Sequence, residues 1–191
     1  MYKRLLAITL ALLLAACSGI PLRSMPKLMA LQGQLLEANP AEFLFAVQVD
    51  ARLVPPAGAV PELALAIRPA KPGAFEAVDR KLPMAMTVAA ANGLGLATPP
   101  AHRRWLIYAL TPESRAELAR LQAQFKRLRA QRGETGGGSL SLGIAQEGIA
   151  VADPALADTH WESWLRVSRR DGFFELWSGT LAELRKLAKS G

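Results

Sequence analysis

The histidines and serines of this chain are the first residues to test for chemistry, because such residues supply general bases and nucleophiles. The sequence contains two histidines, His102 and His160, and neither has the i, i+4 partner that a zinc-binding helix would show. Asp158 and His160 could join Ser139 or Ser141 in a hydrolase constellation, but no Gly-x-Ser-x-Gly elbow holds either serine. We therefore predict no metal site and no cofactor, and we interpret the surroundings of His160 as an exposed polar loop.

Two further groups of residues invite a catalytic interpretation but have simpler structural ones. Glu162 and Glu175 could act as a glycosidase pair, yet the arginines around them favour surface ion pairs. The glycine-rich run at 133–139 lacks the lysine of a phosphate-binding loop, so a flexible connector accounts for it. The sequence thus predicts a protein that is not an enzyme, with a periplasmic hydrolase that uses a site near His160 as one alternative.

Tryptophans and arginines are interleaved near the C-terminal end of the chain. Three of the four tryptophans lie there, at Trp161, Trp164 and Trp177. A hairpin that turns at Asp171-Gly172 would place Arg166 across from Trp177, where a cation–π contact can form. Because tryptophan and arginine are enriched at binding hot spots, Trp164, Arg166 and Trp177 are the candidate interaction face. The alternative is that the tryptophans belong to the core.

The N-terminal residues follow the order of a secretory signal peptide. Lys3-Arg4 form a short basic start, residues 5–14 are an apolar run, and the small residues Ala15-Ala16 precede Cys17. The apolar run is shorter than the about 20 residues that a membrane-spanning helix needs. We therefore predict a cleaved signal peptide at residues 1–16.

The sequence Leu14-Ala15-Ala16-Cys17 resembles the lipobox of bacterial lipoproteins. This resemblance implies a diacylglyceryl group on the Cys17 thiol and a further acyl chain, such as palmitate, on the new amino terminus. Ser18 differs from the aspartate of an inner-membrane retention signal, so the implied location is the periplasmic face of the outer membrane. Each buried methylene contributes about 0.8 kcal/mol, and three chains would hold the protein almost irreversibly. The alternatives are an ordinary signal peptide cut nearby and a lone cysteine in an apolar segment.

Composition and charge restrict the partners of the protein. The chain of 191 residues is 51% hydrophobic and 6% aromatic, which is an ordinary globular composition. Without the predicted signal peptide, which carries Lys3 and Arg4, its formal net charge is +5, which is spread along the chain and favours anionic partners such as lipid headgroups or acidic protein surfaces. Nucleic acid is not expected as a partner in the periplasm. With the single cysteine acylated, no thiol remains for disulfides, catalysis or metal binding.

Residues 17–27 are expected to form the lipidated N-terminus and a tether, and residues 28–191 a single globular periplasmic domain. Alternating apolar residues predict the strands of this domain, and Phe45, Val47 and Val49 are the clearest example. The predicted strands cover 42–54, 62–68, 82–89, 105–110 and 140–151, followed by a hairpin on both sides of Asp171-Gly172. Within the third of these, Pro83 argues for an edge position.

Two helices complete the predicted fold. Thr111 and the following proline are typical of a helix start, and leucines at helical spacing continue the pattern through Pro112–Arg132. Thr180 and Glu183 have the spacing of a capping box for a final helix. We predict an α+β fold, an antiparallel β-sheet of about five to seven strands packed by the long helix and capped by the short C-terminal one.

These observations favour a non-enzymatic structural or assembly protein over the catalytic alternatives. The predicted partners are the membrane, reached through the lipid anchor, and an envelope protein. A carrier of a small apolar ligand is the other alternative, and it would need a deep apolar cavity inside the sheet. The expected location is the outer membrane, on its periplasmic face.

Overall fold

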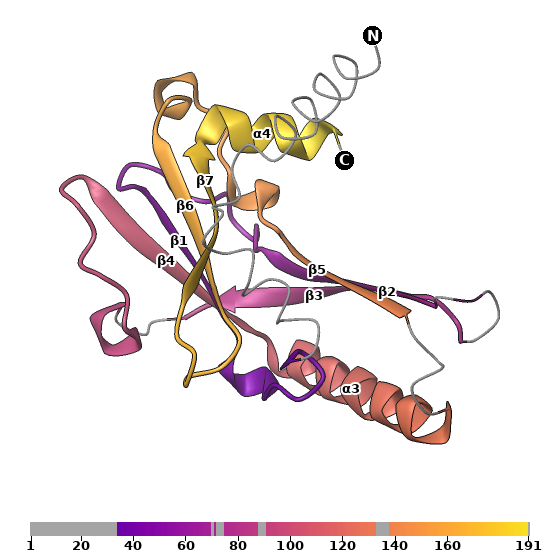
Figure 1. Ribbon diagram of the computed structural model, residues 1–191. Helices are drawn as coiled ribbons and strands as arrows, with labels where there is room; N and C mark the ends of the chain where they lie inside the picture. The colour runs from indigo at the N-terminus through magenta and orange to yellow at the C-terminus, as the bar shows by residue number, and fades with distance from the viewer. Residues whose placement is uncertain (1–33, 70, 72–74, 88–90, 133–137, 191) are drawn as a thin grey trace, which may run out of the picture.

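The computed structural model describes residues 34–69, 71, 75–87, 91–132 and 138–190 of the chain (Figure 1). The predicted signal peptide, Cys17 and the predicted tether lie outside the described residues. The elements that position the candidate site are all described.

The described residues form a seven-stranded sheet in the order β5-β2-β3-β4-β1-β6-β7, and every pairing is antiparallel. This confirms the predicted antiparallel sheet. The strands are β1 (Leu44–Asp50), β2 (Glu62–Pro69), β3 (Val78–Met86), β4 (Arg103–Leu110), β5 (Gly138–Ala145), β6 (His160–Arg166) and β7 (Phe174–Thr180). The two longer helices are α3 (Pro112–Arg132) and α4 (Leu181–Ser190), and short 3-10 turns include η2 (Pro40–Glu42), η3 (Ala91–Leu94), η5 (Glu147–Ile149) and η6 (Pro154–Leu156).

The sheet bends strongly at β3. Residues 78–83 of β3 pair with β2, whereas residues 84–86 pair with β4. In Figure 1, β2, β3 and β5 therefore extend to the right, while β1, β4, β6 and β7 stand steeply beside them. The predicted edge position of the strand that contains Pro83 is wrong, because β3 lies between β2 and β4. Pro83 is tolerated at the bend because its missing N–H falls where β3 changes partners.

The main core lies on the inner face of this curled sheet. Alternation along β1 turns Phe45, Val47 and Val49 into the main core, and all three side chains are fully buried. The largest fully buried side chains are Trp161, Tyr108, Phe43, Phe45, Leu35, Leu53, Leu63, Met84, Leu118, Ile149, Leu165 and Leu181. Burial of this apolar area is the main source of stability in a domain whose described residues hold no cysteine.

Both predicted helix starts have the expected caps. The backbone N–H of Ser114 donates to Thr111 Oγ1 at 3.1 Å, so Thr111 caps α3. At α4 the capping box is reciprocal: Thr180 N–H donates to Glu183 Oε2 at 2.7 Å, and Glu183 N–H donates to Thr180 Oγ1 at 3.2 Å. These hydrogen bonds lower the pKa of the Glu183 carboxyl.

The long helix α3 contributes apolar side chains to the main core without covering the whole sheet. Leu118, Leu121 and Phe125 are buried there. The principal neighbours of α3 are β3, β4 and η2. A buried Gln122 side chain ties the helix to the first described residues, because its amide donates to the carbonyls of Leu35 at 2.7 Å and Ala38 at 2.9 Å. Packing of the entire sheet by this helix is therefore not confirmed.

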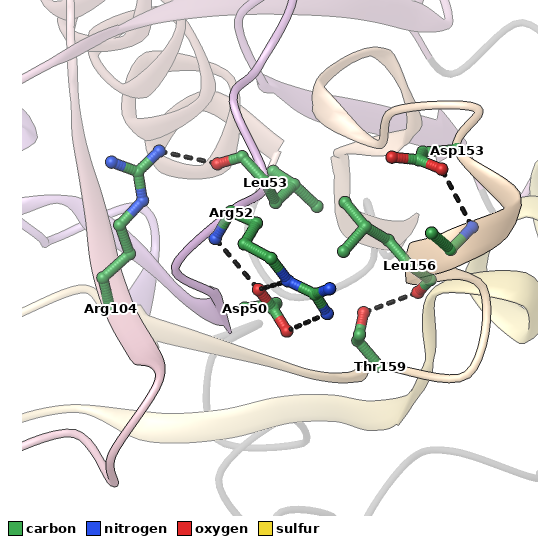
Figure 2. Close-up of polar contacts among 8 residues, drawn as sticks. Asp50, Arg52, Leu53, Arg104, Asp153, Leu156 and Thr159 are labelled. Carbon is green, nitrogen blue, oxygen red and sulfur yellow. Dashed lines mark hydrogen bonds and ion pairs between the residues drawn. The ribbon is translucent and has the colours of Figure 1, made fainter.

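The loop that leaves β1 is fixed by charged side chains (Figure 2). Asp50 Oδ1 accepts hydrogen bonds from the backbone N–H and the Nε of Arg52, both at 2.9 Å, and Oδ2 accepts from Arg52 Nη2 at 2.9 Å. From β4, Arg104 Nη2 donates to the Leu53 carbonyl at 2.6 Å. The loop thereby keeps the Leu53 side chain in the main core. In the neighbouring loop, Thr159 donates to the Leu156 carbonyl at 2.6 Å.

Candidate interaction face

The β6–β7 hairpin carries the predicted face, but its register differs from the prediction. β6 ends at Arg166 and β7 begins at Phe174, so the connection is longer than a two-residue turn at Asp171-Gly172. The strand partner of Trp177 is Ser163, and Arg166 instead pairs with Leu44 of β1. The predicted cross-strand pair of Arg166 and Trp177 is therefore wrong.

Contacts with a distant segment explain the longer connection. Glu42 Oε2 accepts a hydrogen bond from the Arg169 backbone N–H at 2.8 Å, and the Glu42 carbonyl accepts one from Arg166 Nε at 3.3 Å. Val167 is buried in the main core instead of continuing the strand ladder. Gly172 still has a left-handed backbone with φ of 67°, which is the conformation that a turn glycine supplies, but it lies inside the longer loop.

Alternation along β6 divides the tryptophans between two faces of the sheet. Trp161 points into the main core, whereas Trp164 lies on the opposite, outer face and is half-buried. β7 has a bulge at Leu176, because Ser163 pairs with Trp177 and Trp164 pairs with Glu175. The bulge returns Trp177 to the main core. The core interpretation therefore holds for Trp161 and Trp177, and Trp164 alone of the three lies on the outer face.

Trp164 belongs to a second apolar group, which we call the outer-face cluster. Its members are Leu44, Ala46, Leu96 and Ile107, which are buried, and Ala91, Leu94, Trp105, Ala109, Trp164 and Phe173, which are half-buried. The rings of Trp105 and Trp164 meet edge to face, with centroids 6.4 Å apart and planes at 79°. Trp105 Nε1 donates to the Ala97 carbonyl at 2.9 Å, so the segment that follows η3 is held over β4.

A row of charged side chains borders the outer-face cluster. Glu162 Oε1 accepts a hydrogen bond from Arg103 Nη1 at 3.0 Å and lies 3.1 Å from His160 Nε2. The second carboxylate oxygen accepts from Trp164 Nε1 at 3.4 Å. Arg103 Nη2 also donates to the Gln48 carbonyl at 2.9 Å. Glu162 thus fixes the orientation of the Trp164 indole and of the neighbouring cations.

Arg166 positions the other end of the outer-face cluster. Its side chain is 8% exposed, and its guanidinium lies 5.3 Å from the centroid of the Phe173 ring. Burial, together with the nearby charge of Arg169, lowers the pKa of the Arg166 guanidinium. Because it is buried, Arg166 supports the outer-face cluster from beneath and does not itself form an exposed contact.

Ser141 and His160, which were considered for catalysis together, lie on strands that do not pair with each other. Ser141 pairs with Ala66 of β2, whereas His160 pairs with Thr180 of β7 and contacts Glu162. His102 stands in a left-handed turn with φ of 63° before β4. Among the described residues, no group of three or more His, Cys, Asp and Glu side chains is arranged to hold a metal ion. The part of the chain that the structure describes contains no helix with the length and apolarity of a membrane span.

Sequence reasoning identified Trp164 but missed Trp105 and the segment that covers it. The run at 105–110 was interpretable only as a buried strand, because its residues are almost all apolar. Trp105 meets Trp164 only through the pairing of β1 with both β4 and β6. The one sequence signal for this part of the site was Trp105 itself, an isolated tryptophan at the start of that run.

The fold and the site together define an antiparallel sheet domain with an apolar cluster on its outer face. No family model, curated protein sequence or solved structure matches the chain. Its function must therefore be inferred from its own residues and geometry.

Proposed function

We propose that this protein is a lipid-anchored, non-enzymatic assembly protein that binds an envelope protein through its outer-face cluster. The anchor is the lipidated Cys17 that the lipobox resemblance implies, and the location is the periplasmic face of the outer membrane. The carrying observation is the pair Trp105 and Trp164, two half-buried indoles packed edge to face on the outer side of the sheet.

The chemistry of the outer-face cluster suits a protein partner. Tryptophan contributes strongly to protein interfaces because it combines a large apolar area with an N–H donor. Both indoles are already oriented by hydrogen bonds, from Trp105 to the Ala97 carbonyl and from Trp164 to Glu162. A partner therefore has little side-chain entropy to remove on binding, which favours affinity.

The charges beside the cluster supply specificity. Arg103 and Glu162 are held together at 3.0 Å and are largely buried. Such a fixed pair at the border of an apolar patch selects partners whose polar groups match it and rejects those whose groups do not. A solvated, unpaired arginine would give weaker discrimination.

Site-specific photo-crosslinking in the native host tests this proposal. A benzoylphenylalanine replaces Leu94, a half-buried member of the outer-face cluster, in the full-length chain. The matched position is Val54, which is 68% exposed and lies in the loop after β1. We expect a discrete crosslinked envelope protein from position 94 and not from position 54. Equal products from both positions would contradict the proposal.

Substitution of Trp164 then tests the cluster itself. We expect Trp164→Ala to reduce the position-94 product at least tenfold, because truncation of a tryptophan hot spot costs about 2 kcal/mol or more. Val54→Ala serves as the control variant and should leave the yield unchanged. Circular dichroism of both variants establishes that each is folded. A folded Trp164→Ala variant with the wild-type yield would contradict a role for the outer-face cluster.

A further inference from the structure

β5 lies at one edge of the sheet and pairs only with β2 among the described residues. The ladder between them runs without interruption from Glu62 opposite Ala145 to Pro69 opposite Gly138. The other side of an edge strand presents unpaired backbone N–H and C=O groups, and such a row is a template for a further strand. β5 therefore has a hydrogen-bonding edge that nothing in the described structure uses.

The two edges of the sheet differ in how they are protected. At the opposite edge, β7 contains a bulge at Leu176, which discourages pairing with another strand. β5 has the sequence GSLSLGIA, eight residues without a charge or a proline. Its register with β2 also continues through Gly143 without a shift. Among the described residues, β7 thus has a bulge against edge pairing, and β5 has no bulge, charge or proline.

We propose that β5 pairs antiparallel with β5 of a second copy of this chain, so that two sheets join into one across a two-fold axis. An antiparallel strand pair is compatible with a two-fold axis, and two-fold dimers are the commonest symmetric assemblies. The interface lies on β5, away from β1, β4 and β6, which carry the outer-face cluster. The dimer is therefore independent of the proposed partner binding.

The lack of charged residues on β5 permits a second copy as the occupant of this edge. Without the predicted signal peptide, which carries Lys3 and Arg4, the chain keeps a formal net charge of +5, so two copies repel one another over most approaches. β5 carries no charged residue, and two β5 strands meet without placing like charges opposite each other. In the described structure, two copies can therefore meet at this edge without electrostatic repulsion between their β5 strands.

Apolar side chains at the margin of the main core also favour this pairing. Leu142 and Ile144 lie opposite Leu65 and Leu63 of β2 and pack against the main core, but both remain half-buried. Across a β5–β5 junction these side chains would lie on the same face of the joined sheet as Leu142 and Ile144 of the second copy. Pairing would thereby remove apolar area from water that the single copy leaves exposed.

The pleat of the strand limits the register of the dimer. Directly opposite residues of antiparallel strands point to the same face, so outer-face residues must meet outer-face residues. The pairings with the greatest overlap are consequently centred on Ser141 or on Leu142. In the first, Ser141 lies opposite its own copy; in the second, it lies opposite Gly143 of the second copy. A substitution at Ser141 therefore reaches the junction in either register.

Sedimentation of the full-length chain in detergent, at a series of protein concentrations, tests the proposal. Ser141 is exposed, so Ser141→Lys adds a charge at the junction without entering the main core. Ser178→Lys adds the same charge at a half-buried serine on the outer face of β7, at the other edge of the sheet. We expect dimers for the wild type and for Ser178→Lys, and at least a tenfold higher dimer dissociation constant for Ser141→Lys. Circular dichroism checks that both variants are folded.

Mixing variants of opposite charge identifies the occupant as a second copy. Ser141→Lys and Ser141→Glu should each associate weakly, and an equimolar mixture should recover dimers, because opposite charges then lie directly or diagonally across the junction from each other. A wild type that stays monomeric at every concentration would overturn the proposal. So would equal dimerisation of Ser141→Lys and Ser178→Lys, or a mixture that recovers no dimers. None of these results bears on crosslinking at position 94, so the two proposals fail separately.

Discussion

Tyr108 places a hydroxyl in the main core where, among the described residues, it has no hydrogen-bond partner. Its side chain is 1% exposed, and its ring lies 6.3 Å from that of Phe45. An unpaired buried hydroxyl costs about 1–3 kcal/mol of desolvation. Burial accordingly raises the pKa of the Tyr108 phenol, although Arg104 nearby has the opposite effect. The aromatic ring of Tyr108 stabilises the fold, and its oxygen does not.

Tyr108→Phe should therefore raise the free energy of unfolding, by about 1 kcal/mol at neutral pH. Above pH 10.0 the difference should grow. The folded phenol stays protonated there while the unfolded one ionises, so the wild type loses stability as pH rises and the variant does not. Urea unfolding of both proteins at neutral and alkaline pH measures this. A variant less stable than the wild type would show that the hydroxyl is paired.

Asp50 gives a second test at the scale of a single residue. The hydrogen bonds from Arg52 lower the pKa of the Asp50 carboxyl from 3.8 to about 2. Because the pKa is lower in the folded state, the stabilisation is fully present above about 3.8 and is lost as pH falls through about 2. Asp50→Asn keeps an oxygen that can accept from the Arg52 backbone N–H but removes the charge.

We expect Asp50→Asn to be less stable than the wild type at neutral pH, and the two stabilities to converge as the solution is acidified through about pH 2. Unfolding monitored by circular dichroism across the acidic range gives both curves. The other carboxylates titrate in both proteins, so the difference between the curves isolates Asp50. A difference that does not change with pH would contradict the role of the charge.

At the scale of elements, a buried polar group connects the end of β5 with β6. Gln146 Oε1 accepts hydrogen bonds from Trp161 Nε1 at 3.0 Å and from Ser163 Oγ at 2.6 Å. All three side chains are buried. β5 and β6 are far apart in the strand order, so this contact joins the two parts of the curled sheet through its interior.

Gln146→Ala should lower the free energy of unfolding by about 1–3 kcal/mol, because it removes the acceptor of the buried Ser163 hydroxyl and one of the two acceptors of the Trp161 indole. Gln124→Ala, on the exposed side of α3, is the matched control and should change stability by less than about 0.5 kcal/mol. Urea denaturation compares the three proteins. Equal stabilities of the two variants would mean that the hydrogen bonds of Gln146 contribute nothing to the fold.

Elements with a strong local signal could be predicted from the sequence, and those that depend on distant contacts could not. The alternation of Phe45, Val47 and Val49 predicts β1, because a half-buried strand has a period of two. The central position of Pro83 depends on β3 changing partners at that residue, which leaves no local signal. The β6–β7 register depends on Glu42, far away in the sequence.

For the candidate site too, the sequence predicted what depends on local composition and did not predict what depends on strand pairing. Interleaved tryptophans and arginines drew attention to Trp164, which does lie on the outer face. Its neighbour Trp105 comes from another strand. A bulge in β7, which no sequence pattern predicted, turns Trp177 into the core. Local composition thus located the region, and strand pairing decided which side chains face outward.

At the scale of the whole molecule, we propose a folded domain that is anchored to a membrane by its lipidated N-terminus and has two separate interaction surfaces. The outer-face cluster lies mainly on β1, β4 and β6, and β5 is an edge strand of the sheet that the described residues form. Anchoring confines copies to a surface and so raises their effective concentration, which assists a dimer of modest affinity. The same confinement would keep a bound partner close to the membrane.

Intact mass spectrometry of the full chain, purified from envelopes of its native host, tests the anchor most directly. We predict a chain that lacks residues 1–16 and begins at Cys17, with a mass increase that matches a diacylglyceryl group and one further acyl chain. A Cys17→Ser variant should lose that increase and leave the membrane fraction. A wild-type protein with an unmodified Cys17 would contradict both the membrane location and the proposed function.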